Sequence, residues 1–190
     1  MKENVKKEIE EIIKNYNLNC PIGKFEDNVD SEWISANHNL SEDFIIEFKN
    51  KVNWKWISIG QKLSEEIIRE FKDKVNWTNI SWEQELSENF IREFKDKVDW
   101  YCISKKQDLS ENFIRELKDK VNWHCIFSCQ KLSLCFIGKF QDKVNWNFIS
   151  KYQDITKKDI KKLKQQKIIE LEKQKLEKTR VKNKFKLIRF

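Results

Sequence analysis

A 23-residue internal repeat constrains the fold of this chain more than any other feature of its sequence. Two copies, LSENFIREFKDKVDWYCISKKQD at 86–108 and LSENFIRELKDKVNWHCIFSCQK at 109–131, match at most positions. Six consecutive copies follow one another without insertion, at 17–39, 40–62, 63–85, 86–108, 109–131 and 132–154. A fixed period of this length is typical of a solenoid, in which each short unit buries its apolar face against its neighbours.

Capping residues divide each copy into two predicted helices. A serine precedes the first apolar stripe, and an Asn or Asp precedes a Trp and an Ile that lie three residues apart. The first caps are Ser41, Ser64, Ser87, Ser110 and Ser133, and the second caps are Asn53, Asn76, Asp99, Asn122 and Asn145. We expect a first helix of about ten residues and a shorter second helix.

Helices this short are marginal alone, so stability has to come from stacking of neighbouring repeats. One seam of the predicted core is formed by Phe48, Phe71, Phe94, Leu117 and Phe140. The tryptophans beside it are Trp54, Trp77, Trp100, Trp123 and Trp146. Packing in the core is the favoured role for these tryptophans, and stacking on a ligand is the alternative.

The two ends of the array differ from its repeats. Residues 1–16 place Val5, Ile9, Ile12, Ile13 and Tyr16 on one face of a predicted capping helix. Residues 155–190 open like a seventh repeat and then continue as a charged helix to about Thr179. The predicted fold class is all-α: an α-solenoid of six two-helix 23-residue repeats (17–154) with an N-terminal capping helix (1–16) and a C-terminal basic helix (155–190). Thirteen or fourteen helices are expected, since the chain has only one proline and three glycines.

The excess positive charge lies in the C-terminal tail. Between Ile155 and Phe190, 14 Lys and Arg residues face 4 Asp and Glu residues, a net +10, and the other 154 residues carry −3. The lysines that cluster at its start are Lys157, Lys158, Lys161, Lys162, Lys164 and Lys167. They predict binding to an acidic partner, either phosphates of nucleic acid or an acidic protein face, and the alternative is a solvated helix. Phe185, Leu187, Ile188 and Phe190 indicate that the extreme C-terminus docks on an apolar surface.

The exposed face of the second helix varies from repeat to repeat, whereas the rest of the repeat stays constant. Repeat proteins that recognise partners often combine a constant frame with one variable face. The residues assigned to partner binding are Trp56, Ile59, Trp82, Tyr101, Lys105, His124, Phe148 and Tyr152. A protein partner is therefore expected here, and neutral drift with local packing is the alternative.

The charges of the first helix predict a self-neutralised surface. Arg69, Arg92 and Arg115 each follow a glutamate by four residues and precede an aspartate by four. Glu70 and Lys74 repeat this spacing. We interpret this face as solvated rather than as a binding site.

Few residues suit catalysis or a cofactor. There are two histidines and no phosphate-binding glycine loop, so we predict a protein that is not an enzyme and has no cofactor. Cys125, Cys129 and Cys135 lie near His124, but their spacing matches no familiar zinc module. Free thiols in a reducing compartment are the favoured interpretation, and a zinc site is the alternative.

The run L-S-E-x-F-I-R-E-F-K-D-K-V-x-W-x-x-I-S, found at 86–104 and with small changes at 40–58 and 109–127, resembles short tryptophan-containing repeats of giant DNA virus proteins. The resemblance covers 40–154 well and 17–39 weakly, and it brings no activity or binding residue with it. It implies a host-cytoplasmic or virion protein. A soluble intracellular protein without a membrane segment is also expected from the charged N-terminus and from the lack of a long apolar run.

Overall fold

The computed structural model describes residues 1–25 and 31–187, with only the backbone of residues 31, 147 and 181–187. The chain forms two compact units, Met1–Gln107 (unit 1) and Asp108–Phe190 (unit 2). The described residues form thirteen α-helices and one 3-10 helix and contain no strand. The predicted all-α solenoid is confirmed.

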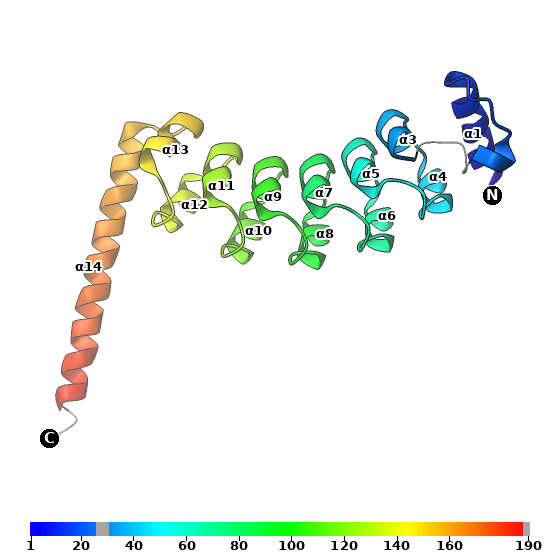
Figure 1. Cartoon of the computed structure of the whole chain (residues 1–190). Helices are drawn as coiled ribbons and strands as arrows, with labels where there is room; N and C mark the ends of the chain where they lie inside the picture. Colours follow the sequence, from blue (N-terminus) through cyan, green and yellow to red (C-terminus); the bar gives the residue numbers. More distant parts are fainter. Residues whose placement is uncertain (26–30, 188–190) are drawn as a thin grey trace. The chain divides into compact units, whose positions relative to one another are not determined.

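Unit 1 consists of two rows of helices, which Figure 1 shows side by side. The second helices of successive repeats pack against one another, α3 on α5, α5 on α7 and α7 on α9. The elements of this unit are α1 (Glu3–Asn15), η1 (Ile22–Lys24), α3 (Ser31–Asn37), α4 (Glu42–Glu47), α5 (Trp54–Gly60), α6 (Glu65–Glu70), α7 (Trp77–Glu83), α8 (Glu88–Glu93) and α9 (Trp100–Lys106). In the degenerate first repeat, the first helix expected before α3 falls partly on residues 26–30, which lie outside the described residues.

Unit 2 continues the same pattern and ends in one long helix. Its elements are α10 (Glu111–Glu116), α11 (Trp123–Cys129), α12 (Leu134–Lys139), α13 (Trp146–Tyr152) and α14 (Lys157–Leu187). Helix α11 packs on α13, and α12 packs on α14. Figure 1 shows α14 projecting away from the helix pairs of this unit. It reaches Leu187 rather than about Thr179, because its residues are strong helix formers with no Gly or Pro to end it.

The predicted caps form, but the first helices are shorter than expected. The Ser64 hydroxyl accepts the backbone N–H of Ile67 at 3.3 Å, and the Asn76 side chain accepts that of Asn79 at 3.0 Å. Helix α6 has six residues rather than about ten. The chain then continues as a hydrogen-bonded turn, in which the Val75 N–H donates to the Phe71 carbonyl at 3.1 Å.

Aromatic and β-branched side chains fill the core as the repeat pattern predicted. Phe90 and Ile91 are fully buried in unit 1, as are Phe113 and Ile114 in unit 2. The predicted seam is buried at Phe48, Phe71 and Phe94 but only half-buried at Leu117 and Phe140.

The repeat tryptophans are half-buried and join consecutive repeats. The ring of Trp77 lies 4.9 Å from that of Phe94 in the next repeat. Its indole N–H donates to the carbonyl of Lys72 at 2.9 Å, in the turn that precedes it. The same indole hydrogen bond is made by Trp54, Trp100 and Trp123. Their predicted packing role therefore includes a hydrogen bond that the sequence analysis did not anticipate.

Glutamine side chains at one position of the repeat, which we call the glutamine ladder, link the backbones of successive repeats within each unit; four of them are buried and Gln153 is half-buried. The Gln84 side-chain oxygen accepts the Leu63 N–H at 2.9 Å, and its amide nitrogen donates to the Gln61 carbonyl at 2.8 Å and the Ser58 carbonyl at 3.5 Å. Each member accepts the backbone N–H of the leucine that begins its own repeat. The ladder consists of Gln61, Gln84, Gln107, Gln130 and Gln153. These amides satisfy buried backbone groups between repeats.

A second set of hydrogen bonds shows how α1 caps the array. In the repeats, a glutamate at the start of one first helix accepts the backbone N–H of the serine cap of the next, as Glu42 does from Ser64 at 2.6 Å. Glu8 of α1 accepts the Ser41 N–H at 2.9 Å and so takes the place of a preceding repeat. Val5, Ile9 and Ile12 of α1 are fully buried. The capping role predicted for residues 1–16 is confirmed.

Replacing Glu111 by glutamine is expected to remove a pH-dependent part of the stability of unit 2. Partial burial pushes the pKa of Glu111 upward, but hydrogen bonds from the Ser133 N–H and hydroxyl and from Arg115 together lower this pKa. The carboxylate therefore stabilises the fold above its unfolded pKa of about 4.3, and that contribution is lost as the pH falls through the lower folded pKa. In urea denaturation, the wild type should exceed the variant in stability near neutral pH, and the difference should shrink below about pH 4. An equal difference at both pH values would contradict this role.

Candidate partner-binding surface

The first-helix face is a network of ion pairs, in which arginines pair with the glutamate four residues earlier as predicted, whereas Asp73 pairs with Lys97 of the next repeat rather than with Arg69. Arg69 pairs with Glu65 of its own helix at 3.3 Å and with Glu93 of the next repeat at 2.8 Å. Arg115 pairs with Glu111 at 2.9 Å. Bonds of this kind between exposed groups contribute little each, so the face is suited to solvent rather than to a charged ligand.

The ion pair expected between Glu70 and Lys74 is replaced by other contacts of Lys74. Helix α6 ends at Glu70, so the four-residue spacing no longer places the two side chains on one face. The Lys74 ammonium instead donates to the Lys49 carbonyl at 3.0 Å and the Asn50 side chain at 2.8 Å, both in the preceding repeat.

The exposed side of the second helices, which we call the second-helix face, carries a cluster of rings and ammonium groups in unit 1. Trp82 extends from the end of α7, and Tyr101, Lys105 and Lys106 extend from α9. The Lys106 ammonium lies 4.4 Å from the centre of the Trp82 ring, and that of Lys105 lies 5.1 Å from it. Lys105 also lies 5.5 Å from the Tyr101 ring and donates to its hydroxyl at 3.4 Å. Tyr101 is 49% exposed.

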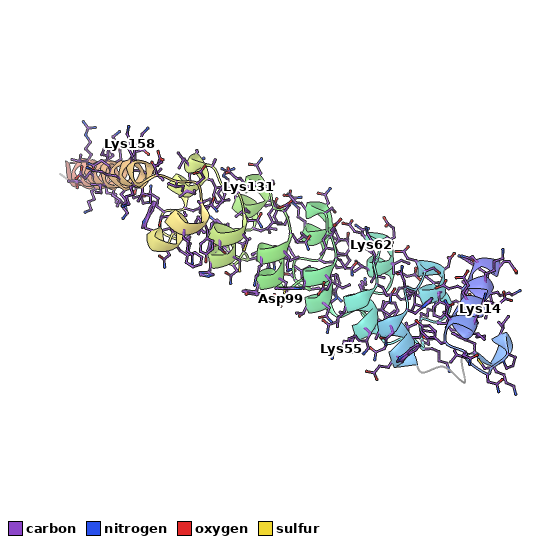
Figure 2. All side chains as sticks on the ribbon, turned by 90° about the horizontal axis from the view of Figure 1, so that it is seen from above. Lys14, Lys55, Lys62, Asp99, Lys131 and Lys158 are labelled. Atoms are coloured by element: carbon purple, nitrogen blue, oxygen red, sulfur yellow. The ribbon has the colours of Figure 1, made fainter. Side chains whose placement is uncertain are left out.

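Trp56 and Ile59 lie on α5, earlier along the same row. The Trp56 indole N–H donates to a Glu32 carboxylate oxygen at 3.1 Å, and the Lys55 ammonium lies 5.9 Å from the Trp56 ring. Figure 2 labels Lys55 at the start of this helix. Ile59 is half-buried and lines a shallow pocket with Lys62 and Glu83.

In unit 2 the predicted residues form a separate aromatic cluster. The ring of His124 on α11 lies 4.2 Å from that of Phe148 on α13, and the Phe148 ring lies 4.5 Å from that of Tyr152. The Lys151 ammonium lies 5.2 Å from the Tyr152 ring. His124 and Tyr152 are exposed, and Phe148 is half-buried.

Sequence reasoning missed Lys106 and Glu32, although the repeat period contains the signal for both. Lys105 follows Trp82 by one full period, and Lys106 is the next residue along the chain. Glu32 precedes Trp56 by one period and one further residue, as His124 precedes Phe148. Positions separated by one period, or by one period and one residue, therefore meet on adjacent second helices.

The tail lysines lie on α14 where predicted, and most point into solvent. Lys157, Lys158, Lys161, Lys162 and Lys164 are exposed, and Lys167 is half-exposed. Figure 2 shows side chains standing out on both sides of α14, with Lys158 labelled. Lys164 lies 5.2 Å from the ring of Trp146, and none of the six forms an ion pair within the described part of the chain.

No cysteine forms a disulfide in the described structure, and no group of three or more His, Cys, Asp or Glu residues in its described part is arranged to hold a metal ion. Cys125 is buried, whereas Cys129 and Cys135 are exposed.

The C-terminal residues Ile188 and Phe190 lie outside the described residues, as do the side chains of Phe185 and Leu187. Within residues 1–25 and 31–187, no helix combines the length and the apolar character that crossing a membrane requires.

Comparison with protein families, with curated proteins and with solved structures gave no match to this chain.

Proposed function

We propose that this protein is a non-enzymatic repeat scaffold that binds a protein partner along its second-helix face. The observation that supports the proposal is the group of Trp82, Tyr101, Lys105 and Lys106, which places large rings and two ammonium groups at the surface of a regular frame. Aromatic side chains present much apolar area with few rotatable bonds, which suits them to interfaces.

The contrast between the two faces strengthens this proposal. On the first-helix face, each of Arg69, Arg92 and Arg115 has a carboxylate within its own helix. On the second-helix face of unit 1, the ammonium groups of Lys105 and Lys106 lie over rings and form no ion pair with a described residue. A partner would therefore gain charge-assisted contacts on the second-helix face without breaking existing ion pairs.

Site-specific photo-crosslinking tests this function. A photoreactive residue at Tyr101 should form adducts with a protein in extracts of the source cell, and the same residue at Lys95, in the turn after α8, should not. Equal adducts from both positions, or adducts from Lys95 alone, would contradict the proposal. Nuclease treatment of the extract excludes bridging by nucleic acid.

A second candidate function is binding of nucleic-acid phosphates by the tail. It is favoured by the exposed lysines of α14, which have no ion pairs among the described residues. Removing residues 165–190 and replacing the remaining tail lysines by glutamine (Lys157, Lys158, Lys161, Lys162 and Lys164) should then abolish binding to duplex DNA, and binding by the full chain should fall steeply as salt is raised. An unchanged salt slope in this variant would rule out the tail as the binding element.

A relationship to the repeat proteins of giant DNA viruses is likewise a proposal. It is supported by the motif at 86–104 alone.

A further inference from the structure

We infer that the cluster of Trp82, Tyr101, Lys105 and Lys106, which we call the indole–lysine site, binds an acidic peptide segment through its carboxylates. This inference rests on the proposed scaffold function and specifies the chemistry of the partner. All four residues belong to unit 1, on the adjacent helices α7 and α9.

The site offers an indole N–H and two ammonium groups but no carboxylate of its own. The Trp82 indole N–H makes no hydrogen bond to a described residue, whereas the indoles of Trp54, Trp77 and Trp100 all donate to backbone carbonyls. The Lys106 ammonium makes no hydrogen bond or ion pair with a described residue, and the Lys105 ammonium donates only to the Tyr101 hydroxyl. An indole N–H and two ammonium groups together are complementary to carboxylates.

A carboxylate of this chain already accepts from an indole N–H in this way at Trp56, on the preceding second helix α5. On the same face of unit 1, a carboxylate oxygen of Glu32 accepts the Trp56 indole N–H at 3.1 Å, and the Lys55 ammonium lies over the Trp56 ring. Trp82 has a closer pair of ammonium groups, yet no described glutamate or aspartate accepts from its indole. An acidic side chain from a partner would accept from the Trp82 indole N–H as Glu32 accepts from that of Trp56.

The geometry favours a peptide over single-stranded nucleic acid. Proteins that bind single strands stack bases on open aromatic faces. Here the Lys106 ammonium lies 4.4 Å from the centre of the Trp82 ring and Lys105 lies 5.1 Å from it, so a base would have to displace a cation that the ring attracts. Carboxylates reach the ammonium groups and the indole edge without that displacement.

Fluorescence anisotropy with two labelled peptides tests the inference on the full chain. One peptide alternates glutamate and leucine, and the other alternates glutamine and leucine. The glutamate peptide should bind more tightly, and K105Q/K106Q should weaken its binding about tenfold. Trp82→Phe, which keeps a ring but removes the indole N–H, should weaken it about threefold. The matched control K72Q/K95Q removes two lysines from the turns after the first helices and should leave binding unchanged, with circular dichroism melts verifying the fold of each variant.

Three results would overturn the inference: equal affinity for both peptides, equal weakening by the control pair, or tighter binding of oligo(dT) that K105Q/K106Q abolishes. The last would assign the site to phosphates. If a partner crosslinks at Tyr101 but the glutamate peptide does not bind, the inference fails and the scaffold function stands. If the peptide binds but no partner crosslinks at Tyr101, the scaffold function fails and the acidic specificity of the site stands.

Discussion

Replacing Gln84 by alanine is expected to lower the free energy of unfolding by about 3–5 kcal/mol. The Gln84 side chain is 5% exposed and bonds one backbone N–H and two backbone carbonyls of the neighbouring repeat boundary. Alanine would leave these groups without their partner in a site that the alanine side chain cannot refill. Each unsatisfied buried group costs about 1–3 kcal/mol, which is why the expected loss exceeds that of a surface substitution.

Urea denaturation followed by circular dichroism measures this effect. The variant Gln84→Glu separates hydrogen bonding from packing, because it keeps the shape but directs a carboxylate oxygen at the carbonyls of Gln61 and Ser58. It should also be strongly destabilised, and lowering the pH should restore part of the loss by protonating the carboxylate. Gln165→Ala, at an exposed position of α14, is the matched control and should change little. A loss below about 1 kcal/mol for Gln84→Ala would show that the ladder does not hold the repeats together.

The fold could be predicted from the sequence in most respects, but the glutamine ladder was not predicted. The 23-residue period predicted the repeat boundaries, both caps and the buried positions, because apolar periodicity and cap chemistry are local signals. The glutamine at a constant position in five repeats is equally visible, but apolar periodicity and cap chemistry assign no role to a polar residue inside a repeat. The buried hydrogen bonds of these amides explain why the same polar residue stands at this position in five repeats.

The binding surface was only partly predictable for a different reason. Variability pointed to the second-helix face, and the structure places Trp82, Tyr101 and Lys105 in contact there. Trp56 lies apart with Glu32, and Lys106 was not anticipated. Which of these side chains meet depends on rotamers and on the offset between adjacent helices, and neither is encoded by the composition of one repeat.

The last repeat departs from the consensus where it meets α14. Gly138 replaces the arginine of the three preceding first helices, and a Cβ there would lie 3.1 Å from the Leu163 side chain. Leu134 replaces the glutamate that accepts from the next serine cap. Accordingly, Thr156 and Asp159 form a capping box of their own, with the Thr156 N–H donating to Asp159 at 3.1 Å. These changes fit a helix that follows the array without being a repeat.

Replacing Phe127 by serine, the residue found at the equivalent position of all four preceding repeats, is expected to destabilise unit 2 by about 3–5 kcal/mol. Phe127 is 3% exposed and packs in one cluster with Ile137, Ile149 and Leu163. Its ring lies 5.5 Å from that of Trp123. Serine would remove most of that volume and leave a cavity that these branched side chains cannot close.

In unit 1, hydrogen bonds of the hydroxyl group compensate for the burial of the equivalent serine. Ser81 is fully buried, but its hydroxyl accepts the Asp99 N–H at 2.9 Å and donates to the Trp77 carbonyl at 2.7 Å. A serine at 127 could regain such bonds, so Phe127→Leu, which keeps an apolar side chain without the hydroxyl, is the control. It should cost about 1 kcal/mol, because most of the volume is retained. Hydrogen exchange should show faster opening of α13 and of the first turns of α14 in Phe127→Ser but not in Phe127→Leu. Equal stability of the serine and leucine variants would contradict this prediction. It would mean that hydrogen bonds of the serine hydroxyl, like those of Ser81, compensate for the lost ring, and that the apolar cluster is not what stabilises the end of the array.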